Sequence, residues 1–405
     1  MAGVVIVGGG QAGFQTADSL RQEGYDGPIA ILGEEPHAPY QRPPLSKAYL
    51  LGETDRERLK FRPEAIYAER GIDLRTGVRV EAIDRAAKAV TLAGGERLAY
   101  GHLVLATGAR VRELPVPGAD LAGVHSLKTL DDVDAIEAGL AAVERVCVIG
   151  AGFIGLEFAA VARKLGKGVT VLEAAPRVMG RVAAPELSEF VTGLHRAHGV
   201  EIVCGAQVSE LRGEGGRVAA VACADGRLFD AGLVVVGIGV VPDVALAEAA
   251  GLECDNGIAV DGFCRTSDPD IFAAGDCASF DHPFAGKRIR LESVQNAADQ
   301  GRIVAAAIAG TPRLYDSVPW FWSDQYDVKL QMAGLMDGCD ETVVRGDPAS
   351  GKFSLLHFRQ GQFRAVDAIS KPADYVQGRK LLEAGLSPTP EQARDTGFKL
   401  KDLLG

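Results

Sequence analysis

Two glycine-rich fingerprints constrain this 405-residue chain more than any other feature. The first, Gly8–Gly13 (GGGQAG), follows an apolar run Val4–Val7 and opens a small-residue helix expected over Ala12–Leu20. The second, Gly150–Gly155 (GAGFIG), follows the apolar run Val146–Ile149. In a βαβ unit such glycines let the backbone approach a pyrophosphate, while the helix N-terminus supplies free N–H groups. The sequence therefore predicts two dinucleotide-binding sites.

The surroundings of the fingerprints separate them from chance matches. Glycine is abundant, with 50 of 405 residues against a usual ~7%, so an isolated match carries little information. Each fingerprint, however, leads to a second strand that ends near an acid, Glu34 after Ile29–Leu32 and Glu173 after Val169–Leu172. A carboxylate about 20 residues after the last glycine suits a ribose 2′-hydroxyl and repels a 2′-phosphate. Glu173 therefore favours NADH over NADPH.

An internal repeat extends beyond the fingerprints. Gly71–Val80 resembles Gly199–Val208, and Gly95–Gly108 resembles Gly226–Gly239. Such self-similarity indicates two copies of one structural unit. Between each fingerprint and the last strand of its repeat we expect a small antiparallel layer. In the second repeat this layer would contain Val200–Val203 and Val218–Cys223.

The rest of the chain completes the first unit and adds a third. Thr266–Asp276 reads as a strand ending in Gly-Asp, followed by a helix over Val294–Ala309. The last ~90 residues contain both tryptophans, short strand-like runs and a helical stretch Tyr375–Ala384, which suggests a separate α+β domain. The predicted fold is α/β, with two Rossmann-like domains and a C-terminal α+β domain. The predicted boundaries are 1–110 with 240–316, 111–239, and 317–405.

Charge and cysteine content exclude several classes of function. The formal net charge of −11 argues against nucleic acid or an anionic membrane as the main partner. Seven cysteines are scattered singly, as expected for buried thiols in a reducing cytoplasm. The first 146 residues contain none, which argues against a redox thiol beside the first nucleotide. We expect Cys147 and Cys277 to be packing thiols.

The chain resembles the FAD- and NADH-dependent ferredoxin reductases of bacterial oxygenase systems, of the putidaredoxin reductase type. The resemblance covers nearly the whole length, and these flavoproteins have glutathione reductase-like architecture. Its specific segments are Tyr40–Lys47 (YQRPPLSK), Ala106–Gly108 (ATG), Gly275–Asp276, Arg290–Ala297 (RLESVQNA) and Pro319–Tyr326 (PWFWSDQY).

The resemblance implies FAD at the first fingerprint and NADH at the second. The implied FAD-binding residues are Gly8, Gly10, Ala12, Gly13, Glu34, Lys47, Val80, Ala106, Thr107, Gly108, Lys128, Gly275, Asp276, Glu292, Ser293, Val294 and Trp322. The implied NAD-binding residues are Gly150, Gly152, Phe153, Ile154, Gly155, Glu157, Glu173, Gly237, Ile238 and Gly239. Lys128 departs from the arginine of relatives, which keeps the charge but loses the planar fork. No metal site is expected.

The same resemblance implies a reaction. Hydride passes from NADH to FAD N5, and single electrons then pass to an acidic [2Fe-2S] ferredoxin that serves a cytochrome P450 or related monooxygenase. Lys47 and Glu157 are expected to pair near the nicotinamide. Ser293 is expected to cap the helix beginning at Val294, whose N-terminus would stabilise a reduced flavin.

Docking of an acidic ferredoxin on an acidic protein requires a local basic patch. The candidate docking residues are Lys287, Arg288, Arg290, Arg302, Arg313, Trp320 and Trp322. The two tryptophans share one face if their segment is a strand, and they would cover the flavin. His195 and His198 share a helical spacing, which we interpret as a solvated face and not a metal site.

Two alternative functions fit the same residues. One is an NADH-dependent reductase of rubredoxin or of a small acceptor such as a quinone or monodehydroascorbate. The other is a redox-responsive interaction protein of the apoptosis-inducing factor type, which would be reduced slowly by NADH.

Overall fold

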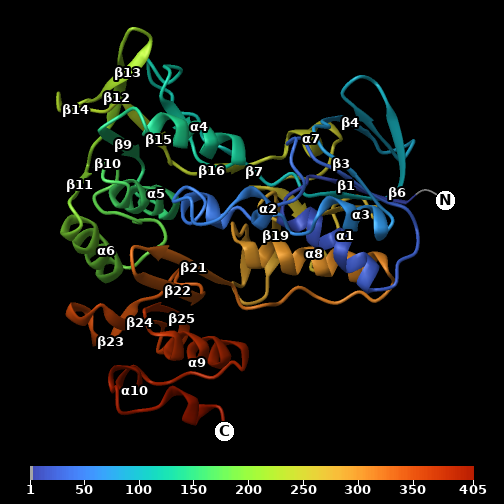
Figure 1. Cartoon of the computed structure of the whole chain (residues 1–405). Helices are drawn as coiled ribbons and strands as arrows, with labels where there is room; N and C mark the ends of the chain where they lie inside the picture. The colour runs from blue at the N-terminus through green and yellow to red at the C-terminus, as the bar shows by residue number, and fades with distance from the viewer. Residues whose placement is uncertain (1–2) are drawn as a thin grey trace. The chain divides into compact units, whose positions relative to one another are not determined.

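The computed structural model describes residues 3–405 and divides into two compact units (Figure 1). Unit 1 comprises Met1–Gln41, Arg56–Arg110 and Val241–Phe321. Unit 2 comprises Arg42–Asp55, Val111–Val240 and Trp322–Gly405. The chain crosses from one unit to the other within β7 (Ala109–Val111), β16 (Val240–Pro242) and β21 (Trp320–Gln325), and at both ends of the segment Arg42–Asp55. The division into three domains stays a prediction.

Unit 1 is built on a largely parallel sheet. Its strand order is β3-β2-β1-β6, with β18 also on β6, and the hairpin β5–β4 continues from β6. The bounds are β1 (Gly3–Val7), β2 (Ile29–Leu32), β3 (Ile72–Arg75), β4 (Val80–Asp84), β5 (Ala89–Leu92), β6 (Arg97–Leu105) and β18 (Ile271–Ala273). Every residue of β1 is buried. A continuous apolar run of this kind is typical of a parallel strand covered on both faces.

Two helices rich in small residues pack side by side in unit 1, α1 (Gln11–Gln22) and α8 (Val294–Ile308) (Figure 1). A Cβ at Gly301 would lie 3.0 Å from the carbonyl oxygen of Ala12, so the contact requires a glycine there. The Ser293 hydroxyl accepts from the Asn296 N–H, which confirms the predicted cap of α8. Unit 1 also contains α2 (Arg56–Leu59), α3 (Glu64–Glu69), α7 (Ala245–Ala249), β17 (Ile258–Val260), β19 (Ala278–His282) and β20 (Lys287–Ile289).

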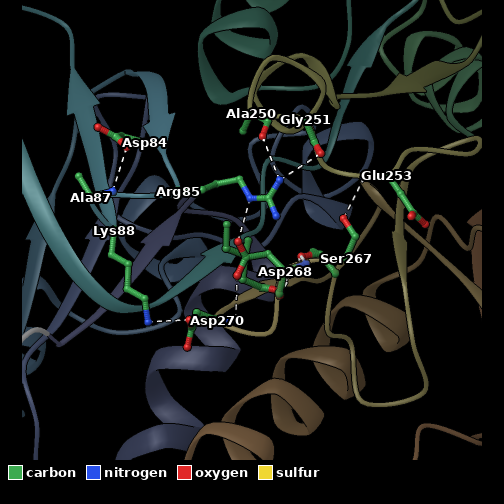
Figure 2. Close-up of polar contacts among 12 residues, drawn as sticks. Asp84, Arg85, Ala87, Lys88, Ala250, Gly251, Glu253, Ser267, Asp268 and Asp270 are labelled. Carbon is green, nitrogen blue, oxygen red and sulfur yellow. Dashed lines mark hydrogen bonds and ion pairs between the residues drawn. The ribbon is translucent and has the colours of Figure 1, made fainter.

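Polar contacts tie the β4–β5 hairpin to the later part of the chain (Figure 2). Arg85 Nε donates to Asp268 Oδ2 at 2.8 Å, and Arg85 Nη1 lies 3.2 Å from the Gly251 carbonyl oxygen. Lys88 Nζ lies 2.6 Å from Asp270 Oδ2. We call these four charged residues the Arg85 clamp. It joins the hairpin to the segment that follows the second repeat.

Unit 2 contains a second parallel sheet with the order β11-β10-β9-β15-β8. The bounds are β8 (Val124–Ser126), β9 (Arg145–Ile149), β10 (Gly168–Glu173), β11 (Val200–Cys204) and β15 (Leu233–Val236), with helices α4 (Leu130–Leu140), α5 (Phe153–Lys164) and α6 (Pro185–Ala197). The antiparallel layer consists of β12 (Val208–Glu214), β13 (Arg217–Cys223) and β14 (Leu228–Asp230). The assignment of Val200–Val203 to that layer is therefore wrong. These residues pair in parallel with β10, as β3 pairs with β2 in unit 1.

The C-terminal part of the chain forms an antiparallel sheet followed by helices. The strand order is β21-β22-β25-β24-β23. The bounds are β21 (Trp320–Gln325), β22 (Val328–Gly334), β23 (Glu341–Asp347), β24 (Lys352–Arg359), β25 (Gln362–Ile369), α9 (Pro372–Glu383), α10 (Pro390–Arg394) and the 3₁₀ turns η2 (Pro348–Ser350) and η3 (Leu400–Leu403). The predicted fold class is confirmed. Within residues 3–405, every helix is too short or too polar to cross a bilayer.

Candidate functional site

The glycines of the first fingerprint have two different structural roles. Gly8 has φ +119°, and a Cβ there would lie 2.1 Å from the Ala106 carbonyl oxygen. A Cβ at Gly13 would lie 2.0 Å from the Gly8 carbonyl oxygen. A Cβ at Gly10, by contrast, would meet no atom within 4 Å. The outer glycines are therefore required by the fold, whereas Gly10 leaves open space at the N-terminus of α1.

The second fingerprint repeats this arrangement in unit 2. Gly150 has φ +104°, and its Cβ would lie 2.5 Å from the Gly237 carbonyl oxygen. A Cβ at Gly155 would lie 2.2 Å from the Gly150 carbonyl oxygen, whereas Gly152 has open space. The first turn of α5 has no side-chain cap, so its N–H groups can bind a phosphate. Both loops therefore fit the pyrophosphate of a dinucleotide.

Other predicted FAD-binding residues of unit 1 lie at strand ends and helix starts near the first loop. The Ala106–Gly108 turn follows β6, and Thr107 Oγ1 donates to the Asp243 carbonyl oxygen at 2.7 Å. Gln300 on α8 accepts from the Gly275 N–H at 2.8 Å, which fixes the Gly-Asp turn after β18. Arg290 Nη1 donates to the Asp276 carbonyl oxygen and pairs with Glu292.

The remaining predicted FAD-binding residues lie in other parts of the chain. Val80 is half-buried at the start of β4, the strand at the edge of the sheet. Lys47, Lys128 and Trp322 belong to unit 2.

The two predicted ribose-binding acids are not equivalent in the structure. Gly8 donates to the Leu32 carbonyl and Gly150 to the Leu172 carbonyl, so Glu173 corresponds to Gly33 and not to Glu34. Glu173 accepts from the Ala151 N–H at 2.7 Å and from the Ala175 N–H at 2.8 Å. Its carboxylate is thus held against the second glycine loop.

Glu34 has a different environment. Its side chain is 69% exposed and lies 3.8 Å from Arg79 Nε, so it is not held against the first loop. Its predicted contact with a ribose requires the side chain to be ordered by the ligand.

Two arginines follow Glu173 and bear on the preference for NADH. Arg177 donates to the carbonyl oxygens of Ala183 and Gly180 and to Ser188 Oγ, so its guanidinium is used inside its own loop. Arg181 lies nearer the site, because a Cβ at Gly239 would be 3.3 Å from Arg181 Nη2. The guanidinium of Arg177 is therefore occupied by partners of its own loop and is not free to attract a 2′-phosphate.

A buried carboxylate stands on α5 beside the second loop. Glu157 is 2% exposed, and its Oε2 lies 2.6 Å from Lys47 Nζ. The same oxygen accepts from Ser46 Oγ at 2.6 Å, and Oε1 accepts from Ser323 Oγ at 2.6 Å. The paired Lys47 and Glu157 are thus present in unit 2.

The segment that carries Lys47 is fixed to unit 2 by further polar contacts. Arg42 Nη1 donates to the Lys128 carbonyl oxygen at 2.8 Å, and Tyr49 Oη donates to Asp134 Oδ1 at 2.9 Å. These contacts, together with the packing of η1 (Pro43–Ser46) on α5, explain why Arg42–Asp55 groups with unit 2.

Sequence reasoning missed both serines. Ser46 and Ser323 stand inside segments that carry the family resemblance, YQRPPLSK and PWFWSDQY. A single hydroxyl in a motif, however, gives no signal of the carboxylate it will contact.

The interpretation of His195 as part of a solvated face is wrong. Its side chain is fully buried, and Nε2 lies 2.8 Å from Gln325 Oε1. His198 is exposed and stacks on Tyr326, with ring centroids 3.6 Å apart. The sequence spacing shows that the two histidines are one helical turn apart, but not that Gln325 of β21 and Tyr326 contact His195. Among residues 3–405 no group of three or more potential ligands is arranged to hold a metal ion.

Comparison with known families decides the class of the protein. The model of the pyridine nucleotide-disulphide oxidoreductases matches residues 2–301, and that of the reductase C-terminal domain matches residues 320–404. The chain belongs to the pyridine nucleotide-disulphide oxidoreductase family.

Individual relatives of this oxidoreductase narrow the group. Rhodocoxin reductase of Rhodococcus erythropolis is 49% identical, over 98% of this chain and 93% of that protein. The ferredoxin reductase for the CYP199A2 system from Rhodopseudomonas palustris is 48% identical, with a TM-score of 0.97 and 99% of each chain covered. The reductase in the covalent putidaredoxin reductase–putidaredoxin complex is 41% identical, with a TM-score of 0.97 over 100% of this chain and 98% of that chain. The resemblance to the FAD- and NADH-dependent ferredoxin reductases is therefore confirmed.

The predicted docking arginines of this oxidoreductase are paired with acids. Arg288 contacts Asp281, Arg290 contacts Glu292, Arg302 contacts Asp299, and Arg313 contacts Glu23. These pairs reduce the net positive charge that the isolated sequence positions suggest. Trp320 and Trp322 lie on the same face of β21, opposite Ser323.

The cysteines of this oxidoreductase behave as packing groups. All seven are free, and Cys147, Cys264 and Cys277 are fully buried. Burial raises the pKa of each of these three thiols. They are therefore neutral and poorly nucleophilic near pH 7, which fits a family member that works without redox thiols.

Proposed function

We propose that the protein carries electrons from NADH through FAD to a separate [2Fe-2S] ferredoxin, which serves a cytochrome P450 or related monooxygenase in the cytoplasm. One observation carries the proposal: one chain builds two glycine loops with the same open space for a pyrophosphate. FAD, when bound, accepts a hydride and releases electrons one at a time. The names of the relatives, a rhodocoxin reductase and a putidaredoxin reductase, support a ferredoxin as the acceptor.

The proposed roles of the residues follow the two units. In unit 1 the first glycine loop, the Ala106–Gly108 turn, the Gly275–Asp276 turn and the capped start of α8 would hold FAD. In unit 2 the second glycine loop and Glu173 would hold the adenosine half of NADH. Lys47 and Glu157 would orient the reacting nicotinamide, and Trp322 would shield the flavin. No acid or base is required, because hydride transfer is the chemistry of the cofactors.

The iron–sulfur centre would belong to the partner. A [2Fe-2S] centre is held by four cysteines, or by two cysteines and two histidines, with closely spaced cysteines among them, whereas the seven cysteines here are spread singly along the chain. Free buried thiols also fit a reducing compartment. An acidic ferredoxin would dock over the arginines of unit 1 and the tryptophans of β21, with electrostatics guiding the encounter.

The acceptor is tested with a panel assayed under one NADH concentration. The panel contains [2Fe-2S] ferredoxins, rubredoxins, a soluble quinone and ferricyanide, the last as a control that accepts electrons from any reduced flavin. The proposal expects at least one ferredoxin to be reduced with a much higher kcat/KM than any rubredoxin or quinone. Preference for rubredoxin or quinone would support the alternative of a rubredoxin or small-acceptor reductase. Very slow flavin reduction by NADH would support a redox-responsive interaction protein of the apoptosis-inducing factor type.

A further inference from the structure

The Glu157 carboxylate receives hydrogen bonds from two distant parts of the chain. Ser46 and Lys47, on the segment between β2 and α2, both donate to Oε2 at 2.6 Å. Ser323, on the first strand of the C-terminal sheet, donates to Oε1 at 2.6 Å. A buried carboxylate needs such donors on both oxygens, because it has lost its hydration. Ser323 is the donor that fixes the second oxygen.

The directions of the hydrogen bonds beyond Ser323 follow from donor chemistry. An ionised carboxylate only accepts, so the Ser323 hydroxyl hydrogen is directed at Glu157. The Ser323 oxygen then accepts from Gln325 Nε2 at 3.3 Å. The amide oxygen of Gln325 in turn lies 2.8 Å from His195 Nε2, which must carry a hydrogen. We call Glu157, Ser323, Gln325 and His195 the Glu157 relay.

The far end of the relay is also determined. With Nε2 protonated in a neutral ring, His195 Nδ1 is an acceptor, and Tyr326 Oη lies 3.4 Å from it. Burial is the main cause that lowers the pKa of His195, so the ring is neutral near pH 7. Each hydrogen bond of the relay therefore has a defined donor and a defined acceptor.

Burial makes the relay rigid. Ser323 and His195 are fully buried, and Gln325 is 4% exposed. Ser323 and Gln325 point to one face of β21, whereas Trp322 points to the other. The same strand can thus present an aromatic ring on one face and hold Glu157 with the other.

We propose that Ser323 is a positioning residue for hydride transfer, acting through Glu157. Its hydroxyl holds the carboxylate in the orientation that pairs with Lys47, while Gln325 and His195 hold the hydroxyl. The inference rests on the proposed function, which places Lys47 and Glu157 beside the nicotinamide. It gives the C-terminal sheet a part in the NADH half of the reaction, separate from shielding the flavin.

The test compares S323A and S323T with S354A as a matched control. Ser354 is equally buried in the same C-terminal sheet and donates to Asp374 Oδ2 at 3.0 Å, so S354A also removes a serine–carboxylate bond. In single turnovers of the FAD-loaded protein, S323A should slow flavin reduction by NADH about tenfold or more, since small misplacements cost large factors. S323T and S354A should stay near the wild-type rate.

Two readouts separate positioning from loss of structure. The dissociation constant of NAD⁺, measured by calorimetry, should change less than the rate in S323A, because the adenosine half binds elsewhere on unit 2. In nitrogen-15-histidine NMR, the Nε2–H signal of His195 should change in S323A and persist in S354A. If S323A melts well below S354A, the comparison of S323T with S323C carries the test, since cysteine is a poor donor of similar size.

The double variant S323A/E157Q tests whether Ser323 acts through Glu157. S323A should add little slowing in the E157Q background, because the group that it positions is already altered. A wild-type rate in S323A, or an equal slowing by S323A in both backgrounds, overturns the inference alone. A wild-type rate in E157Q would overturn the role given to Glu157 in the proposed function, and the inference with it.

Discussion

At the residue scale, the glycines of the two fingerprints meet two different physical requirements. Gly8, Gly13, Gly150 and Gly155 are glycines because a side chain would collide with backbone atoms. Gly10 and Gly152 have free space for a side chain, so the fold does not require them to be glycine. Close approach of a phosphate gives the reason for their lack of a side chain.

Gly155→Ala and Gly152→Ala should therefore fail in different ways. G155A places a Cβ 2.2 Å from a carbonyl oxygen and should lower the thermal midpoint strongly or prevent folding. G152A should keep the midpoint within a few degrees but weaken NAD⁺ binding, because its methyl occupies the space of the pyrophosphate. Circular dichroism melts and calorimetric titration with NAD⁺ measure both effects. Equal stability of the two variants would contradict the distinction.

Glu173 should set the preference for NADH. Glu173→Gln keeps an oxygen for the Ala151 N–H but removes the charge that repels a 2′-phosphate. The kcat/KM ratio of NADH to NADPH should fall about tenfold, the order expected for one charged contact. Steady-state assays with ferricyanide measure the ratio, and E210Q, at an exposed glutamate on β12, is the control. An unchanged ratio in E173Q would remove Glu173 from the specificity argument.

At the element scale, the Arg85 clamp explains how a late segment joins an early hairpin. Arg85 at the end of β4 binds Asp268 and the carbonyl oxygens of Ala250 and Gly251 (Figure 2). The hydrogen bond to Arg85 helps to lower the pKa of Asp268 against the opposing effect of burial. Contacts of this kind join residues far apart in sequence, so no local pattern predicts them.

Arg85→Ala should destabilise unit 1 more than Arg97→Ala. Arg97 lies on the same sheet and pairs with Asp84, but both side chains of that pair are well exposed, so its loss should cost well under 1 kcal/mol. Loss of Arg85 leaves Asp268 and two carbonyl groups without their donor and should cost about 1–2 kcal/mol. Urea unfolding of the two variants gives the difference, and equal midpoints would show that the clamp adds nothing beyond a surface ion pair.

At the scale of the whole molecule, the sequence predicts the architecture well because the repeat and the fingerprints are local patterns. Strand patterns and glycine positions predict both parallel sheets, short strand-like runs predict the C-terminal sheet, and Ser293 before Val294 predicts the cap of α8. The errors concern tertiary contacts. Burial of His195 depends on its contact with Gln325 of β21, and β11 joins the parallel sheet through its pairing with β10.

Buried histidines should make the stability of the whole chain depend on pH. Burial lowers the pKa from its ordinary value of 6.5 at four histidines: His102, His125, His195 and His282. The unfolded chain therefore binds protons at a higher pH than the folded chain. Stability should be at its full value above pH 6.5 and fall as the pH drops below it.

Thermal midpoints between about pH 8 and about pH 5 test this expectation. His282→Gln should reduce the acid sensitivity, because burial lowers the pKa of His282 in the folded chain. A midpoint that rises on acidification would have the wrong sign.

The central claim is that electrons pass from NADH through FAD to a one-electron protein acceptor. The most direct measurement is an anaerobic titration of the FAD-loaded protein and an excess of oxidised [2Fe-2S] ferredoxin with limiting NADH, followed by visible absorbance. Because one hydride carries two electrons and a [2Fe-2S] centre accepts one, we expect two ferredoxins to be reduced for each NADH, with a much slower reaction for NADPH. Bleaching of the flavin by NADH with no reduction of any ferredoxin in the panel would contradict it.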